Sequence, residues 1–427
     1  MIDPIILKGF RDSLPKEEIP KKRITRKLED VFSSYGFVPI DTPVLEYTNV
    51  LLGKGGGETD KQVFRFQDNG KRDVSMRFDL TVPFARFMAT HSQELALPFK
   101  RYHINKVWRG ENPQKGRYRE FIQCDFDIVG ADNAASDFEI LSMMHSSFSA
   151  LGIEGYTFHL SHRGLFNAFL ERIGAKDASV EILRAVDKLR KIGEDEVLRL
   201  LEEISGGRDK AELILKYITA GEGREFEETL SVLEGLAGEC PGSARLKEIY
   251  SLLCSAGIEK SFTLDPSITR GLDYYTGIVY ETFLDELPSI GSVCSGGRYN
   301  NLASLYTKEE LPGVGSSIGL DRLLAALEEL RSPILSSTSS SDVLISFRSE
   351  DTALAVKTAQ ALRSNGIRTD AFLIPDAKMK KIYDYIDRNS IPYMLSFNGS
   401  AYALKKVSTR ETKEFDSLDG VIRELCD

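Results

Sequence analysis

The chain has 427 residues, of which 42% are hydrophobic and 28% are charged, and its formal net charge is -9. This composition is typical of a soluble globular protein, and the length exceeds one ordinary core, so two or three domains are expected. Proteins that coat nucleic acid are usually basic, so an acidic chain would contact RNA only through local patches. No stretch is apolar for long enough to be a signal peptide or a membrane span, and the five cysteines include no CxxC pair. We therefore expect a cytoplasmic protein with reduced thiols and no metal site of its own.

The N-terminal segments predict a helix, an edge strand and a loop. A basic amphipathic helix is expected over residues 17–35, where Gly36 would end it. Residues 36–46 contain two prolines and predict a strand that ends at Pro43, since proline belongs at the edge or the end of a strand. The glycine-rich run 54–58 lacks the spacing of a phosphate-binding loop and is interpreted as a plain loop.

Asp79 lies in a segment, residues 74–83, whose alternation of apolar and polar residues predicts a strand. Its carboxylate has two interpretations. It either caps a helix that Pro83 would begin, or it has the ligand-binding role that the family resemblance described below implies.

Residues 99–130 predict a long antiparallel hairpin. Residues 99–108 are rich in β-branched and aromatic side chains, and two glycines, a proline and an asparagine mark a turn at 110–116. From Tyr118 onward apolar residues alternate with polar ones, which predicts a second strand with one polar face. That face carries Gln123, Asp125 and Asp127.

The hairpin is rich in cations near its turn, namely Arg109, Lys115, Arg117 and Arg119. Guanidinium groups match phosphate oxygens bidentately, so several of them on one hairpin predict an anion site. The amide of Gln123 and the carboxylate of Asp127 suit a ligand with a cationic end, such as an amino acid. The alternative is a solvated basic hairpin that pairs with surface carboxylates.

Downstream of the hairpin, helices and strands alternate. A helix is expected over 136–150, a strand over 155–160, and a mostly helical region over 165–256. Residues 291–300 predict a strand that runs into a Gly-Gly turn, and residues 313–323 predict a small-residue strand that enters a helix.

Two of the later segments carry candidate chemistry. Residues 264–277 contain Arg270 and two neighbouring tyrosines, Tyr274 and Tyr275. A strand that only packs in a core would not need so many polar groups. The alternative there is an Arg–Asp pair beside two core aromatics. The helix that follows the small-residue strand bears Arg322, whose planar guanidinium suits stacking on a flat ring.

A serine-rich stretch, residues 331–341, interrupts the periodic pattern and is interpreted as a linker. Beyond it strands and helices alternate, which predicts a small α/β domain over 342–427. The expected strands are 342–347, 368–374, 392–397 and 401–407, and the expected helices are one that ends at Asn365 and one over 378–389.

Several runs of sequence resemble those of the class II aminoacyl-tRNA synthetases. The run PQKGRYREF in the hairpin is similar to motif 2 of the histidyl-tRNA synthetases, and RGLDYYTG is close to a signature of that family. Residues 36–46 and 313–323 resemble motifs 1 and 3, and MRFDLTVPFAR resembles a segment from one branch of the family. The resemblance implies an α+β catalytic domain on an antiparallel sheet over 1–330, with a helical insertion at about 165–256, and an α/β anticodon-binding domain over 342–427.

The resemblance also implies the two-step reaction of these enzymes. Histidine and ATP would form histidyl-adenylate and pyrophosphate, and histidine would then pass to tRNA(His), in a homodimer joined through the motif 1 region. Mg²⁺ would accompany the ATP phosphates. Histidine would be bound by Asp79, Thr81, Gln123, Asp127, Tyr274 and Tyr275. ATP would be bound by Arg109, Glu111, Arg117 and Arg322, with Arg109 and Arg270 as the catalytic cations.

Two other functions fit parts of the pattern. A catalytically silent, histidine-sensing relative, the regulatory subunit of ATP phosphoribosyltransferase, shares the resemblance. Such relatives tend to lose the motif 2 loop and the C-terminal domain, and this chain has both. An RNA-binding scaffold is disfavoured by the sequence pI near 5.4. Asn300 stands where the family usually has aspartate, which leaves the role of that side chain open.

Overall fold

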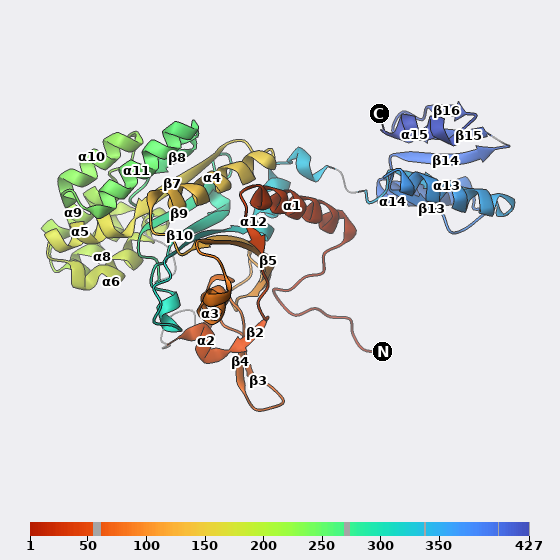
Figure 1. The fold of residues 1–427 in the computed structure, drawn as a ribbon. Helices are drawn as coiled ribbons and strands as arrows, with labels where there is room; N and C mark the ends of the chain where they lie inside the picture. Colours follow the sequence, from red (N-terminus) through yellow and green to blue (C-terminus); the bar gives the residue numbers. More distant parts are fainter. Residues whose placement is uncertain (54–60, 269–273, 337–338, 400, 427) are drawn as a thin grey trace. The chain divides into compact units, whose positions relative to one another are not determined.

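The computed structural model describes residues 1–53, 61–268, 274–336, 339–399 and 401–426, with the backbone alone described at 190 and 191. The chain forms two compact units. One unit comprises Met1–Arg11 and Thr25–Ser332, and the other comprises Asp12–Ile24 and Pro333–Asp427. Figure 1 shows a sheet with helices around it in the larger unit, and strands and helices of an α/β fold in the C-terminal part of the chain. Within the described ranges, no helix has both the length and the apolarity needed to cross a bilayer.

The larger unit is built on a sheet of eight strands in the order β1-β5-β6-β11-β10-β9-β7-β8. The outermost pairs, β1 with β5 and β7 with β8, are parallel, and every pairing between them is antiparallel. This sheet confirms the predicted α+β class. The strands are β1 (Val38–Pro39), β5 (Phe99–Trp108), β6 (Glu120–Val129), β11 (Gly313–Gly319), β10 (Cys294–Arg298), β9 (Ile278–Leu284), β7 (Tyr156–His162) and β8 (Phe262–Leu264).

Helices cover one face of the sheet. The polar side chains of β6 lie on the other face, where a ligand site could form. The end of α1 (Pro15–Ser34) places Phe32 against β6, with its ring 4.9 Å from that of Phe126. The helix α4 (Ala134–Ala150) lies beside α1, where Ser142 and Ser146 bond the hydroxyl of Tyr35. Because successive side chains of a strand point to opposite faces, Gln123, Asp125 and Asp127 face away from Phe126.

A three-stranded sheet in the order β2-β4-β3 carries the segment that holds Asp79. Its strands are β2 (Leu45–Tyr47), β4 (Asp73–Met76) and β3 (Arg65–Gln67), and the short α2 (Thr48–Leu52) and α3 (Thr81–His91) pack beside it (Figure 1). The strand predicted over 74–83 therefore ends at Met76, and the helix expected from Pro83 begins earlier, at Thr81.

The predicted helical region is confirmed as seven helices beside β7 and β8 (Figure 1). Glycine ends one of them, since Gly206 adopts φ 76°, the left-handed conformation that closes many helices. The helices are α5 (Arg163–Arg172), α6 (Ser179–Val186), α7 (Leu189–Ile192), α8 (Glu194–Ser205), α9 (Arg208–Ile218), α10 (Phe226–Ala237) and α11 (Pro241–Ala256).

Two strand predictions near glycine and proline were wrong. The strand expected to end at Pro43 is β1, which ends at Pro39 on the edge of the sheet, where a missing N–H costs no ladder bond. The Gly-Gly pair expected in a turn lies inside β10. A Cβ at Gly296 would lie 2.1 Å from the carbonyl oxygen of Gly315, so the close approach of β11 requires glycine in that strand.

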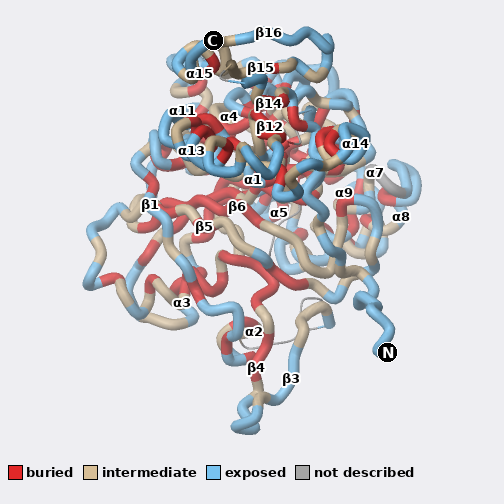
Figure 2. Tube along the Cα trace, turned by 90° about the vertical axis from the view of Figure 1, so that its right-hand side faces the viewer, coloured by how far each residue is buried: buried red, intermediate tan, exposed pale blue. Residues whose placement is uncertain are grey.

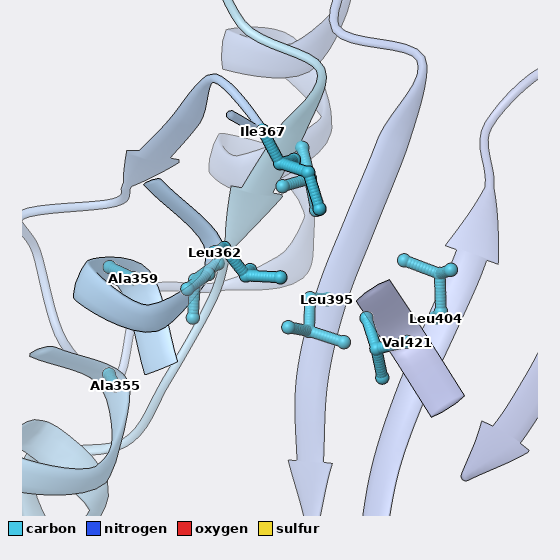
Figure 3. Packing of buried hydrophobic residues seen from close by; sticks show 9 residues of the cluster. Ala355, Ala359, Leu362, Ile367, Leu395, Leu404 and Val421 are labelled. Carbon is cyan, nitrogen blue, oxygen red and sulfur yellow. The ribbon is translucent and has the colours of Figure 1, made fainter. Parts of the chain in front are cut away.

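The smaller unit contains a five-stranded sheet in the order β13-β12-β14-β15-β16. Figure 3 shows its core, where Val421 of the last helix packs beside Leu395 and Leu404 of two strands. The prediction missed β16 and α15, because the exposed edge strand is mostly polar. The elements are β12 (Val343–Ile345), α13 (Thr352–Ser364), β13 (Thr369–Ala371), α14 (Met379–Asn389), β14 (Tyr393–Asn398), β15 (Ala401–Lys406), β16 (Thr412–Phe415) and α15 (Leu418–Cys426).

Candidate active site

The predicted hairpin is present, and its two strands share one polar face. β5 has the predicted bounds, and β6 begins at Glu120 rather than at Tyr118. The register sets Arg101 opposite Asp127 and His103 opposite Asp125. Opposed residues of an antiparallel pair project from the same face of the sheet. Figure 2 shows β6 as a buried strand, so these polar groups lie inside the molecule.

A cavity of about 180 Å³ opens at the turn of the hairpin, with β10, β11 and the start of α12 (Leu320–Glu329) as its other walls. Gln123 lines the cavity too, which connects it to the polar face of β6. The structure therefore brings together the four residues predicted to bind ATP, which are Arg109, Glu111, Arg117 and Arg322.

The three arginines of this cavity are held by different partners. Arg109 donates from Nε to the carbonyl of Phe78 at 2.9 Å, and Arg322 donates from Nη1 to the carbonyl of Ser292 at 2.6 Å. Burial, together with the nearby Arg117 and Arg109, lowers the pKa of Arg322 to about 10. Carbonyl groups neutralise no charge, so Arg109 and Arg322 retain the positive potential that an anionic ligand would neutralise.

Arg117 has an acidic partner, and the other basic residues of the hairpin point elsewhere. Arg117 Nη1 lies 3.5 Å from Glu111 Oε2. Lys115 pairs with Glu329 at 2.6 Å, and Arg119 donates to the carbonyls of Glu111 and Lys8. The expectation that all four cations converge was therefore wrong for Lys115 and Arg119. The alternative of pairing with a surface carboxylate holds for Lys115, whereas Arg119 donates to backbone carbonyls.

Asp127 forms the centre of a second, fully buried part of the site. Its Oδ2 lies 2.7 Å from Nη2 of Arg101, and its Oδ1 accepts the hydroxyl proton of Tyr299. A Cβ at Gly315, opposite on β11, would lie 1.9 Å from this carboxylate, so glycine makes room for it. Burial raises the pKa of Asp127, and Arg101 opposes that rise.

Asp79 satisfies both of its interpretations. One oxygen accepts the backbone N–H of Val82 at 3.0 Å, which caps the start of α3. The other oxygen, Oδ2, is buried and has no hydrogen-bond partner among the described residues. Burial raises the pKa of Asp79 to about 6, while Arg109 and Arg101 act against the rise. A buried carboxylate oxygen without a donor is expected to meet one on a ligand.

The remaining predicted histidine ligands surround these two carboxylates. Gln123 donates from Nε2 to Ser317 at 2.8 Å, and its Oε1 is buried without a partner in the part of the chain that the structure describes. Tyr274 and Tyr275 lie edge to face with ring centroids 5.0 Å apart. Thr81 Oγ1 lies 3.5 Å from Asp125 Oδ2. All six predicted residues thus lie in one cluster, of which Gln123 also lines the cavity described above.

The sequence analysis assigned no role to three residues of the pocket, namely Arg101, Asp125 and Tyr299. The alternation of β5 and β6 placed Asp125 on the polar face but could not show which side chains of the two strands meet. Arg270 lies outside the described residues. Asn300 accepts from Arg298 at 3.1 Å and donates to Asp132 at 2.8 Å, a bridge that an aspartate could not make because it would meet Asp132 as a second anion.

A largely antiparallel sheet whose hairpin carries an arginine-lined cleft beside buried carboxylates agrees with the class II aminoacyl-tRNA synthetase core that the sequence resemblance implies. The Histidyl-tRNA synthetase family model matches residues 9–323, and the chain belongs to that family. It is 53% identical over 400 residues to a histidine–tRNA ligase of Treponema denticola, which covers 92% of this chain and 89% of the relative.

Solved structures agree with this assignment. A histidyl-tRNA synthetase from Nostoc sp. PCC 7120 superposes with a TM-score of 0.88 at 27% identity, over 100% of this chain and 99% of that one. An ATP phosphoribosyltransferase regulatory subunit/histidyl-tRNA synthetase from Bacillus halodurans superposes with a TM-score of 0.77, over 93% of this chain and 100% of that one. At 21% identity, the second likeness shows the fold alone.

Proposed function

We propose that the protein is a histidine–tRNA ligase, which joins histidine to ATP as histidyl-adenylate and then transfers histidine to tRNA(His). One observation carries the proposal. The arginine-lined cleft and the pocket of buried carboxylates lie on the same sheet face and meet at Gln123. An anionic nucleotide and a cationic amino acid would therefore bind next to each other, as adenylate formation requires.

The chemistry needs positioned charges rather than a covalent nucleophile. Attack of the histidine carboxylate on the α-phosphate brings two anions together, so cations must relieve their repulsion and stabilise the transition state. Arg109 would do this from the cleft, and the family resemblance gives Arg270 the position between the reacting groups. Asp79 and Asp127 would hold the cationic groups of histidine.

The residues of the cleft fit Mg²⁺ as a companion of the ATP phosphates. Mg²⁺ prefers hard oxygen ligands and is usually held by one or two carboxylates together with substrate phosphates. Glu111 supplies a carboxylate on the cleft wall among the arginines. When bound, the ion would offset phosphate charge there, while the side chains named above orient the reactants.

We further propose that the protein is a homodimer that joins through β1 and the segment after it. Four large apolar side chains there are exposed in the single chain: Val38 at 45%, Val44 at 38%, Leu45 at 44% and Tyr47 at 53%. Exposed apolar groups gathered near a sheet edge favour burial against a partner. Light scattering should give the mass of two chains, and a monomer at micromolar concentration would contradict the proposal.

Residues 342–427 would bind the anticodon of tRNA(His). A role in protein synthesis would place the protein in the cytoplasm. The competing function, a histidine-sensing regulatory subunit, is disfavoured because the motif 2 hairpin is complete and the identity to histidine–tRNA ligases is high.

The decisive test is pyrophosphate exchange. Purified protein should exchange pyrophosphate into ATP only when histidine is present, and should charge tRNA(His). Arg270→Gln should slow single-turnover adenylation about a hundred- to a thousandfold at an unchanged melting temperature. Exchange that does not depend on histidine would refute the function. A variant that melts early but activates histidine at the original rate would refute only the role of Arg270.

A further inference from the structure

The N-terminal segment, residues 8–11, lies against the hairpin that carries the arginine-lined cleft. The backbone N–H of Arg119 donates to the carbonyl of Gly9 at 2.9 Å, and Nη1 of Arg119 donates to the carbonyl of Lys8 at 3.3 Å. Gly9 adopts φ 88°, and a Cβ there would lie 2.8 Å from the side chain of Arg119. Glycine therefore permits a closer contact with the hairpin than other residues would allow.

Arg11 extends from this segment to two elements that form the cleft. Its Nη2 lies 2.7 Å from Oδ1 of Asp321 in the first turn of α12. Its Nη1 donates to the hydroxyl of Tyr118 at 3.2 Å, and the guanidinium lies 4.1 Å from the centroid of that ring. Tyr118 lines the cleft, and Asp321 directly precedes Arg322, which lines it too. One side chain therefore connects the hairpin to α12.

Asp321 connects the same helix to the second strand of the hairpin. Its Oδ2 accepts the backbone N–H of Ile122 at 2.7 Å, and Ile122 lies between Phe121 and Gln123, which both line the cleft. The side chain of Asp321 is 5% exposed and that of Arg11 is 34% exposed. Because this ion pair is partly shielded from water, it contributes more than a pair on the open surface.

The relative position of the hairpin and α12 determines how the cleft can bind phosphate. Arg109 and Arg117 belong to the hairpin, whereas Arg322 belongs to α12. A guanidinium binds phosphate oxygens through a planar fork, so the three groups can act on one ligand only when the two elements are held at the right separation. Arg11 lies outside the described lining of the cleft, but it bonds to both elements.

We propose that Arg11 is a positioning residue for ATP, which holds the hairpin and α12 at the separation that the arginines of the cleft require. It acts through Tyr118 and Asp321 and touches neither reactant. This inference rests on the proposed function, in which the cleft binds ATP. It adds that the N-terminal segment sets the affinity of the cleft for ATP. Histidine binding should not depend on Arg11, because Asp127 is held by Arg101 and Tyr299 instead.

Substitution of Arg11 should therefore separate the two substrates kinetically. Arg11→Met removes the ion pair, so the KM for ATP in histidine-dependent pyrophosphate exchange should rise about tenfold. The KM for histidine should change less than about twofold, and the melting temperature should stay the same, since exposed arginines contribute little to stability. Arg11→Lys keeps a cation opposite Asp321 but not the planar group over Tyr118, so its KM for ATP should lie between the two.

The matched control is Arg208→Met in the helical region. Arg208 and Glu212 on α9 also approach to 2.7 Å, and their side chains are 50% and 57% exposed. This variant should change neither KM. An unchanged KM for ATP in Arg11→Met would overturn the inference. Equal rises in both KM values together with earlier melting would overturn it too, because that is the behaviour of a residue that only stabilises the fold.

A second measurement needs only the wild type. Coupling between two sites is reciprocal, so ATP must stabilise the N-terminal segment if that segment favours ATP binding. Hydrogen exchange of the full-length protein should slow when ATP is added at the amide of Phe10, which donates to the carbonyl of Leu7 at 3.0 Å. Unchanged exchange there, in a sample that calorimetry shows to be saturated with ATP, would overturn the inference even if the variants did not fold.

The same experiments distinguish this inference from the proposed function. A wild type that binds ATP but shows no histidine-dependent exchange would overturn the proposed function, while hydrogen exchange would still decide the role of the segment. A wild type that shows the exchange, with no effect of Arg11→Met on the KM for ATP, would overturn only the inference. A folded wild type that binds no ATP would overturn both.

Discussion

Replacement of Arg101 by methionine tests the charge balance of the pocket most directly. The guanidinium is fully buried, its Nη2 lies 2.7 Å from Asp127, and it packs 4.1 Å from the ring centroid of Phe84. Methionine keeps a long apolar stem against that ring but removes the charge. A matched control exists in the same chain, because Arg65 and Asp73 also approach to 2.7 Å, but their side chains are 59% and 44% exposed.

Burial decides the size of the expected effect. Removal of one member of a buried ion pair leaves an uncompensated charge and costs about 3–5 kcal/mol of the free energy of unfolding. Exposed pairs contribute little, so Arg65→Met should leave stability nearly unchanged. The two pairs have the same closest N–O separation and differ strongly in burial.

The loss at Arg101 should also depend on pH. Arg101 lowers the pKa of Asp125 and Asp127, so both values rise when it is removed. A carboxyl group whose pKa is raised by folding binds a proton that the unfolded chain releases, and its contribution to stability falls as pH rises from about 4 toward the folded value. Because Asp125 already titrates near 7, the variant should lose more stability at about pH 8 than at about pH 5.

Urea denaturation of wild type and both variants at these two pH values measures the effect. An Arg101→Met variant as stable as Arg65→Met would refute the reasoning, since burial would then make no difference. A loss that is the same at both pH values would refute the effect of Arg101 on the pKa of Asp125 and Asp127, although the ion pair itself could still be important.

Three further predictions concern the separate parts of the site. Asp127→Asn keeps the shape of the side chain but removes its charge, so histidine affinity measured by calorimetry should fall roughly a hundredfold; an unchanged affinity would make Asp127 structural. Arg322→Ala should raise the KM for ATP in pyrophosphate exchange about tenfold or more, whereas Lys115→Ala, whose amine pairs with Glu329 away from the cleft, should not. Deletion of the chain from Asp342 onward should spare exchange and weaken tRNA charging, and equal charging by a well-folded truncated dimer would contradict the role given to the smaller unit.

The local pattern of apolar and polar residues was enough to predict the strands and helices that position the site. The strand β5 has the bounds that its β-branched and aromatic run predicted, and the small-residue strand before Arg322 leads into its helix as expected. The helical region between β7 and β8 was also predicted from the helical periodicity of its apolar residues alone. These features depend on the spacing of neighbouring side chains, which the sequence displays directly.

Other features arise only where distant segments meet. Lys115 belongs to the basic hairpin by sequence, but in the structure it forms an ion pair with Glu329 on α12. The sequence does not distinguish Arg101 from the other residues of its strand, and only the register of β5 and β6 shows that it lies opposite Asp127. The sequence by itself determined which residue types line the polar face of β6. The tertiary structure decided that Arg101 pairs with Asp127 beside the buried Asp125, because burial and cross-strand pairing depend on contacts between residues far apart in the chain.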